Sequence, residues 1–204
     1  MVRAAMSAPS ATDCEALARA AVDRIVDHGH RENTAAAYGA YAELAQLAVV
    51  HPEVPRLRLW QAWGGFPLVS GHIERPAVDE AQAVIEDLAS LAAAHLDQPD
   101  LRELLARSLS HHAHNCASAG DFAGARAAHA RLVDLVAAHP REPRLVVNLA
   151  ESYLALFLYG AEAGEFAQGR ALANEIRAFA KAHPDEARVR EALGTVEEVL
   201  ARFP

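Results

Sequence analysis

Cysteine is scarce in this chain of 204 residues, which contains only Cys14 and Cys116. Two cysteines cannot build the disulfide framework of a small secreted domain. Residues 1–12 also lack the apolar core of a secretory signal. We therefore expect a cytoplasmic protein with a flexible segment at residues 1–12.

Aromatic residues and strand formers are also few. Aromatics make up 6% of a chain that is 52% hydrophobic, so Ala and Leu must fill most of the interior. Small and straight apolar side chains suit close-packed helices, which predicts an all-α fold. The apolar run Ser152–Ala161 is about half as long as a membrane span requires, so we expect no membrane insertion.

Basic residues are outnumbered, at 19 against 27 acidic ones, for a net charge of −8. Nucleic acids and anionic membranes are bound through clustered Lys and Arg, so this balance argues against both partners. The abundance of Ala, Arg and Leu is typical of a bacterial source with a GC-rich genome.

Recognisable catalytic motifs are missing from the sequence. It contains no Gly-rich phosphate loop, no Gly-x-Ser-x-Gly elbow and no His-Glu-x-x-His. Cys116 has histidines nearby, but a cysteine in a helical core is usually a small hydrophobic residue. We therefore expect no enzyme activity, no catalytic residue and no cofactor.

Histidines do recur, at a fixed spacing of 44 residues: His51, His95, His139 and His183. A fixed period of this order is typical of helical solenoids, in which each repeat buries its apolar face against its neighbours. The spacing predicts one domain over residues 13–204. Its parts are four helical hairpins, at about 13–50, 51–94, 95–138 and 139–182, and a C-terminal capping helix at 183–204.

Residues 44 positions apart form columns of similar side chains. In the second half of each repeat, apolar residues at offsets 0, 3, 7, 10 and 13 lie on one face of a helix. These columns are Ala37, Ala81, Ala125 and Gly169; Ala40, Val84, Ala128 and Leu172; Leu44, Leu88, Leu132 and Ile176; Leu47, Leu91, Leu135 and Phe179; and Val50, Ala94, Ala138 and Ala182.

The first half of each repeat predicts a second amphipathic helix. A proline in the first turn of this helix loses no hydrogen bond, because the backbone N–H groups of the first turn have no partner within the helix. Its fixed φ also suits the helical conformation. Small residues beside large ones allow a neighbouring helix to approach closely. The columns are Leu57, Leu101, Leu145 and Val189, then Ala62, Ala106, Ala150 and Gly194, with Pro55, Pro99 and Pro143 at the starts.

The segment Gly120–Ala125, Gly-Asp-Phe-Ala-Gly-Ala, resembles the start of the second helix in tetratricopeptide repeats, and Gly164–Gly169 is a weaker copy. The Leu105-Ala106 and Leu149-Ala150 pairs and the prolines Pro140 and Pro184 are similar to that family's other signature positions. The resemblance covers residues 13–204, although the family's repeat is 34 residues long. It implies a right-handed stack of helical hairpins whose first helices line a concave groove that binds a partner.

We therefore expect a protein-interaction adaptor that binds a partner peptide or helix. By the resemblance, groove-facing positions fall on the first helices of three repeats. The candidate binding residues are Arg56, Leu59, Trp63, Phe66, Glu103, Arg107, His111, Arg144, Glu151 and Leu154.

One repeat departs from the pattern at Trp60 to Pro67. Gly64-Gly65 and Pro67 predict that its first helix ends early or kinks. Trp63 stands in a column whose other members are polar, so we expect it to be partly exposed as a binding anchor. Simple filling of the space beside a shortened helix is the alternative.

The segment Ser110–Cys116 is rich in histidine. His111 and His114 share one helix face, and His112 and Cys116 share another, but a zinc site needs at least three protein ligands. His72 stands one period before Cys116. We expect His112 and Cys116 to pack between helices, His111 and His114 to face the groove, and no metal to bind.

Two other functions remain open from the sequence. A sensor would bind a small ligand or peptide in an enclosed pocket near Trp63. A structural module would self-associate, for example as a homodimer, through an apolar patch on a terminal repeat.

Overall fold

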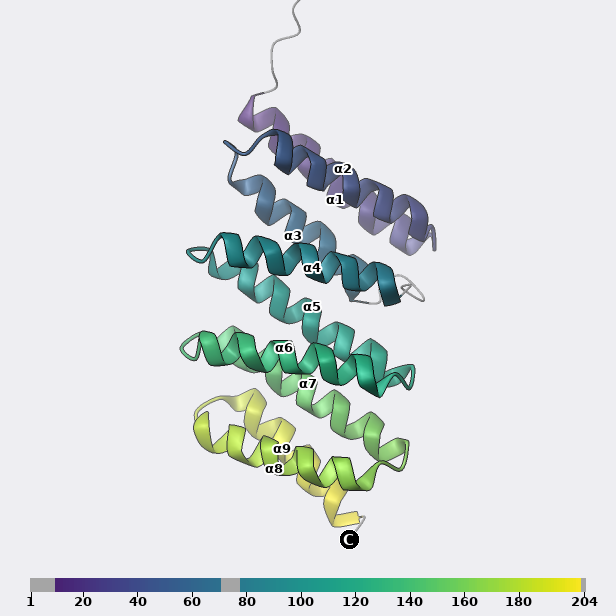
Figure 1. Cartoon of the computed structure of the whole chain (residues 1–204), viewed down its shortest axis with the longest axis vertical. Coiled ribbons are helices and arrows are strands. Elements are labelled where there is room, and N and C mark those ends of the chain that lie inside the picture. The colour runs from purple at the N-terminus through teal and green to yellow at the C-terminus, as the bar shows by residue number, and fades with distance from the viewer. Residues whose placement is uncertain (1–9, 71–77, 203–204) are drawn as a thin grey trace, which may run out of the picture. The chain divides into compact units, whose positions relative to one another are not determined.

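The computed structural model describes residues 10–70 and 78–202 (Figure 1). Within these ranges the chain has nine α-helices and no strand, so the predicted all-α class is confirmed. The chain folds as two compact units, residues 1–76 and 77–204, which we call unit 1 and unit 2.

Unit 1 contains α1 (Ala11–His30), α2 (Thr34–Val50) and α3 (Arg56–Val69), and each of these helices contacts the other two. A capping box starts α1, because Ser10 Oγ accepts the Asp13 N–H and Asp13 accepts the Ser10 N–H. Of the predicted flexible segment 1–12, residues 1–9 lie outside the described residues. The remainder is part of this cap and helix, because the box satisfies donors that would otherwise be unpaired.

Unit 2 contains α4 (Val78–Ala94), α5 (Pro99–Ser118), α6 (Phe122–Ala138), α7 (Pro143–Glu162), α8 (Phe166–Ala182) and α9 (Ala187–Arg202). Each helix contacts the next one, and α7 also contacts both α5 and α9. In Figure 1, α4, α6 and α8 form the layer nearer the viewer, in front of α5, α7 and α9. Pro99 and Pro143 are the first residues of α5 and α7, as predicted.

The spaced histidines end helices. His51, His139 and His183 are the C-cap residues of α2, α6 and α8, and His95 directly follows α4. The carbonyl of each histidine accepts the N–H of the residue three positions later, at distances of 3.1, 3.0, 3.1 and 3.2 Å for His51, His95, His139 and His183. The same turn therefore leads into α3, α5, α7 and α9.

Most of the predicted columns are buried. The three alanines Ala37, Ala81 and Ala125 are fully buried, as are Ala62, Ala106 and Ala150 on the first helices. The column Val50, Ala94, Ala138 and Ala182 is exposed, so its assignment to the buried face is wrong. These four residues are the last of their helices, where the chain has already reached the turn.

α3 ends early, as predicted, but the end does not fall at its Gly-Gly pair. The helix continues through Gly64, Gly65 and Pro67 and ends two residues later, although its 14 residues are fewer than the 20 of α5 and of α7. The glycine matters for packing. A Cβ atom at Gly64 would lie 2.8 Å from Leu44 Cδ2 and 3.0 Å from Ile25 Cδ1. Glycine therefore lets α3 approach α1 and α2 closely.

Gly39 provides a matched control for this close approach, because it is an exposed glycine inside α2 where an added Cβ atom would meet nothing within 4 Å. In Gly39→Ala we expect the free energy of unfolding to rise by about 0.5–1 kcal/mol, from helix propensity alone. In Gly64→Ala the same gain meets an overpacking cost of about 1–3 kcal/mol, because Leu44 and Ile25 are enclosed in the core. Urea unfolding of both variants measures the difference, and equal stabilisation would contradict the close approach.

Candidate functional site

A groove in unit 2 crosses α5, α7 and α9 and has a volume of about 470 Å³. Its lining combines apolar side chains of α7, which we call the floor, with polar and charged groups, which we call the rim. The lining residues are Ser110, His111 and His114 of α5; Glu151, Leu154, Ala155, Leu158, Tyr159 and Glu162 of α7; and Arg188 of α9.

Three of the predicted binding residues line this groove: His111, Glu151 and Leu154. His111 and Leu154 are half-buried, so each has a face available to a ligand. His114, which we also expected to face the groove, lies there too. The structure therefore brings three of the ten candidate residues together at one groove.

Glu103 and Arg144, two further candidates, form an ion pair that joins α5 to α7. The pair holds the pKa of the Arg144 guanidinium above its usual range, through the hydrogen bond first and the charge of Glu103 second. Because the pair is largely exposed on the arginine side, it adds little stability. Arg107, half-buried on α5, is the remaining candidate in unit 2.

The other candidates lie on α3 in unit 1. Trp63 is 46% exposed, which confirms the predicted exposure, and Leu59 is half-buried. Arg56 forms an ion pair with Glu15 of α1 at 3.1 Å. Phe66 is only 9% exposed and belongs to the core. Because α3 packs against both α1 and α2, it buries more of its surface than the comparison of residues 44 positions apart predicts.

Tyr159 and Arg188 are groove residues that we did not predict. The Tyr159 hydroxyl lies 3.2 Å from His114 Nε2, and the two rings meet edge to face with centroids 5.2 Å apart. Arg188 contacts Glu151 at 3.4 Å and Glu191 at 2.7 Å, so it links α9 to α7. A sequence signal for Arg188 exists, since it stands 44 residues after Arg144, which already was a candidate.

His112 and Cys116 are buried, as expected, with Cys116 Sγ 3.6 Å from His112 Nε2. Burial raises the pKa of the Cys116 thiol and lowers the pKa of His112, so both stay neutral near pH 7. A neutral thiol is a poor nucleophile and a poor metal ligand. Among the described residues no three His, Cys, Asp or Glu side chains form a metal-binding group, and His72 lies outside them.

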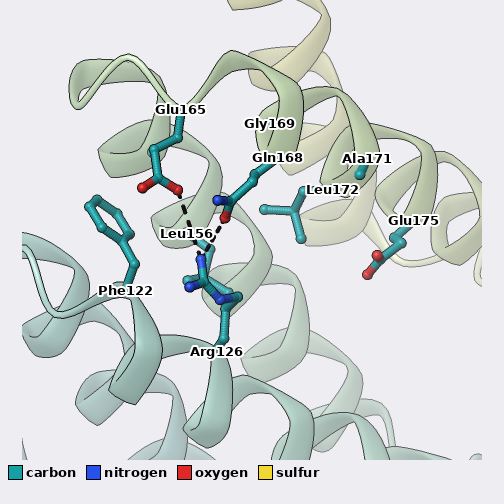
Figure 2. A pocket seen from close by; sticks show the side chains of 10 residues that line it. Phe122, Arg126, Leu156, Glu165, Gln168, Gly169, Ala171, Leu172 and Glu175 are labelled. Carbon is teal, nitrogen blue, oxygen red and sulfur yellow. Dashed lines mark hydrogen bonds and ion pairs between the residues drawn. The ribbon is translucent and has the colours of Figure 1, made fainter.

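A second hollow of about 240 Å³ lies between α6, α7 and α8 (Figure 2). Arg126 of α6 reaches across it to Gln168 Oε1 at 2.5 Å and to Glu165 at 3.8 Å, while Leu156 and Leu172 provide apolar surface. The arginine therefore already spans the opening, and this hollow is smaller than the groove on the other layer.

In residues 10–70 and 78–202, no helix is both long enough and apolar enough to cross a membrane.

The chain matches no known protein family, no curated protein and no solved structure.

Behind the groove floor, a buried histidine connects α6 to α7. His129 Nδ1 lies 2.9 Å from Ser152 Oγ, and the imidazole packs edge-on against Tyr153 with centroids 4.4 Å apart. His129 Nε2 has no hydrogen-bond partner among the described residues. Because a charged imidazole would lose its hydration here, burial lowers the pKa of His129 to about 4.

This histidine makes the stability of unit 2 depend on pH. An unfolded histidine binds a proton near pH 6.5, whereas folded His129 does so only near pH 4, so between these values the unfolded state binds more protons. Stability is therefore fully present above pH 6.5 and falls as the pH decreases. We expect His129 to account for a loss of about 2 kcal/mol between pH 7 and pH 5.

His129→Gln is the matched variant, because its amide can still bond to Ser152 without titrating. Its free energy of unfolding should change less between pH 7 and pH 5 than that of the wild type. Urea titrations at both pH values measure this, and parallel pH profiles for the two proteins would contradict the buried neutral state of His129.

Proposed function

We propose that this chain is a protein-interaction adaptor that binds a partner peptide in the groove over α5, α7 and α9. The observation that carries the proposal is the groove itself: a concave surface of about 470 Å³ built from three helices that hold equivalent places in the sequence period. Binding sites are typically concave and apolar, with few polar groups that fix orientation.

The groove chemistry favours a short peptide with at least one large apolar side chain. Leu154, Ala155 and Leu158 offer an apolar floor along α7, and Tyr159 adds an aromatic edge next to His114. Glu162 and Arg188 at the rim can bond to peptide backbone or polar side chains. Such a floor and rim suit an anchor residue flanked by polar contacts.

We further propose the helical solenoid class for the architecture, with four antiparallel hairpins and a C-terminal capping helix in one domain over residues 13–204. Support comes from the turn after each spaced histidine, and from the nearest-neighbour contacts within unit 2. The likeness to tetratricopeptide repeats, a cytoplasmic location and a bacterial source stay predictions, as does the role of exposed Trp63 as a binding anchor of unit 1.

Selection of random displayed peptides on the purified chain tests the groove. Enriched peptides should bind Leu154→Ala about tenfold or more weakly than wild type, because truncation removes part of the apolar floor. Leu135→Ala is the matched control, a half-buried leucine on α6 that does not line the groove. It should leave the affinity unchanged.

Calorimetric titration of wild type and both variants supplies the affinities, and melting midpoints verify that each variant is folded. Peptides that bind Leu154→Ala as tightly as wild type, or a selection that enriches no peptide, would count against the proposed groove.

A further inference from the structure

Arg102 of α5 is an arginine held almost wholly inside unit 2, with 7% of its surface exposed. Its Nη1 donates to the Leu96 carbonyl at 2.5 Å. Its Nε and Nη2 donate to the Glu142 carboxylate at 3.0 and 2.5 Å. The guanidinium thus bridges the turn before α5 and the turn before α7, with the planar fork geometry that carboxylates favour.

The carbonyl half of this bridge recurs at the period of the chain. Arg58 donates to the Pro52 carbonyl at 3.2 Å, and Arg190 donates to the Pro184 carbonyl at 2.6 Å. Each arginine lies six residues after its acceptor, as Arg102 does. Positions 58, 102, 146 and 190 are 44 residues apart, and three of them are arginine. The exception is Val146 of α7, which is 3% exposed.

The groups that would accept hydrogen bonds from an arginine at position 146 are nevertheless present. Pro140 stands where Leu96 stands one period earlier, and Glu186 stands where Glu142 stands. A hollow of about 270 Å³ lies between these two turns, and its lining includes Pro140, Arg141, Val146, His183, Asp185 and Glu186. Within the part of the chain that the structure describes, the carboxylates of Asp185 and Glu186 have no hydrogen bond or ion pair.

The charge of the hollow favours a cation. Asp185 and Glu186 contribute two negative charges, Arg141 contributes one positive charge, and His183 is the remaining titratable group of the lining. An ammonium could meet this charge, but a guanidinium also matches the paired geometry of a carboxylate and a turn carbonyl. Arg102 shows that pairing within the same unit.

We propose that the hollow bounded by Pro140, Val146 and Glu186 binds the guanidinium group of an arginine side chain from a partner protein. The incoming group takes the place that Arg102 occupies one period earlier, with Glu186 as the carboxylate acceptor and the Pro140 carbonyl as the second acceptor. This site shares no residue with the peptide groove, so the failure of one proposal would not affect the other.

A blocked Gly-Arg-Gly peptide, titrated into isotope-labelled protein and followed by NMR, tests the site directly. Amide shifts should centre on Val146 and Glu186, and the Gly-Lys-Gly peptide should bind several-fold more weakly. Glu186→Gln should weaken the arginine peptide by about tenfold or more. Free arginine serves as a further arm. If free arginine binds as well as the peptide, the guanidinium alone is sufficient for recognition. If free arginine shifts no resonance in this hollow while the peptide does, recognition extends to the peptide backbone. Both results support the site.

Val146→Arg is an independent test that fills the hollow from within. An arginine at a buried valine normally destabilises a protein, but here it should raise the melting midpoint and abolish binding of the arginine peptide. Val146→Lys should lower the midpoint, and Glu186→Gln in the Val146→Arg background should remove the gain. The proposal is overturned if the arginine and lysine peptides bind equally, or if Val146→Arg lowers the midpoint as much as Val146→Lys.

Discussion

The turn that follows each spaced histidine is the constraint on which the rest of the structure depends. The histidine carbonyl accepts an N–H three residues later, so one helix ends and the next begins at equivalent residues each time. Side chains 44 residues apart then have equivalent surroundings. Arg58, Arg102 and Arg190 reach carbonyls of their own turns for this reason, and Val146 leaves a hollow where an arginine would be.

Charges along the groove side of unit 2 serve mainly to connect helices. Arg144 pairs with Glu103, and Arg188 pairs with Glu151, so these side chains bridge α5 to α7 and α9 to α7. Exposed ion pairs contribute little free energy, typically about 0–1 kcal/mol. A peptide could therefore replace such a contact at small cost, whereas the apolar floor at Leu154 and Leu158 would supply most of the binding free energy.

The sequence predicted helix ends and buried columns well, because histidine turns and alanine positions are local and periodic. It did not predict contacts that depend on which helices are neighbours. Gly64 suggested a helix end, but it lies inside α3, where Leu44 and Ile25 leave no room for a side chain. Likewise, Phe66 is buried rather than groove-facing, and the pairing of Tyr159 with His114 joins residues from different helices.

Deletion of one full period from unit 2 tests most directly whether 44 residues form the structural repeat. Removal of residues 95–138 joins Ala94 to His139 and keeps a histidine turn between α4 and α7. We expect unchanged helix content per residue by circular dichroism and a cooperative melt. Deletion of residues 95–128, about one tetratricopeptide period, should disrupt both. Loss of helix in the first deletion, with retention in the second, would contradict the 44-residue repeat.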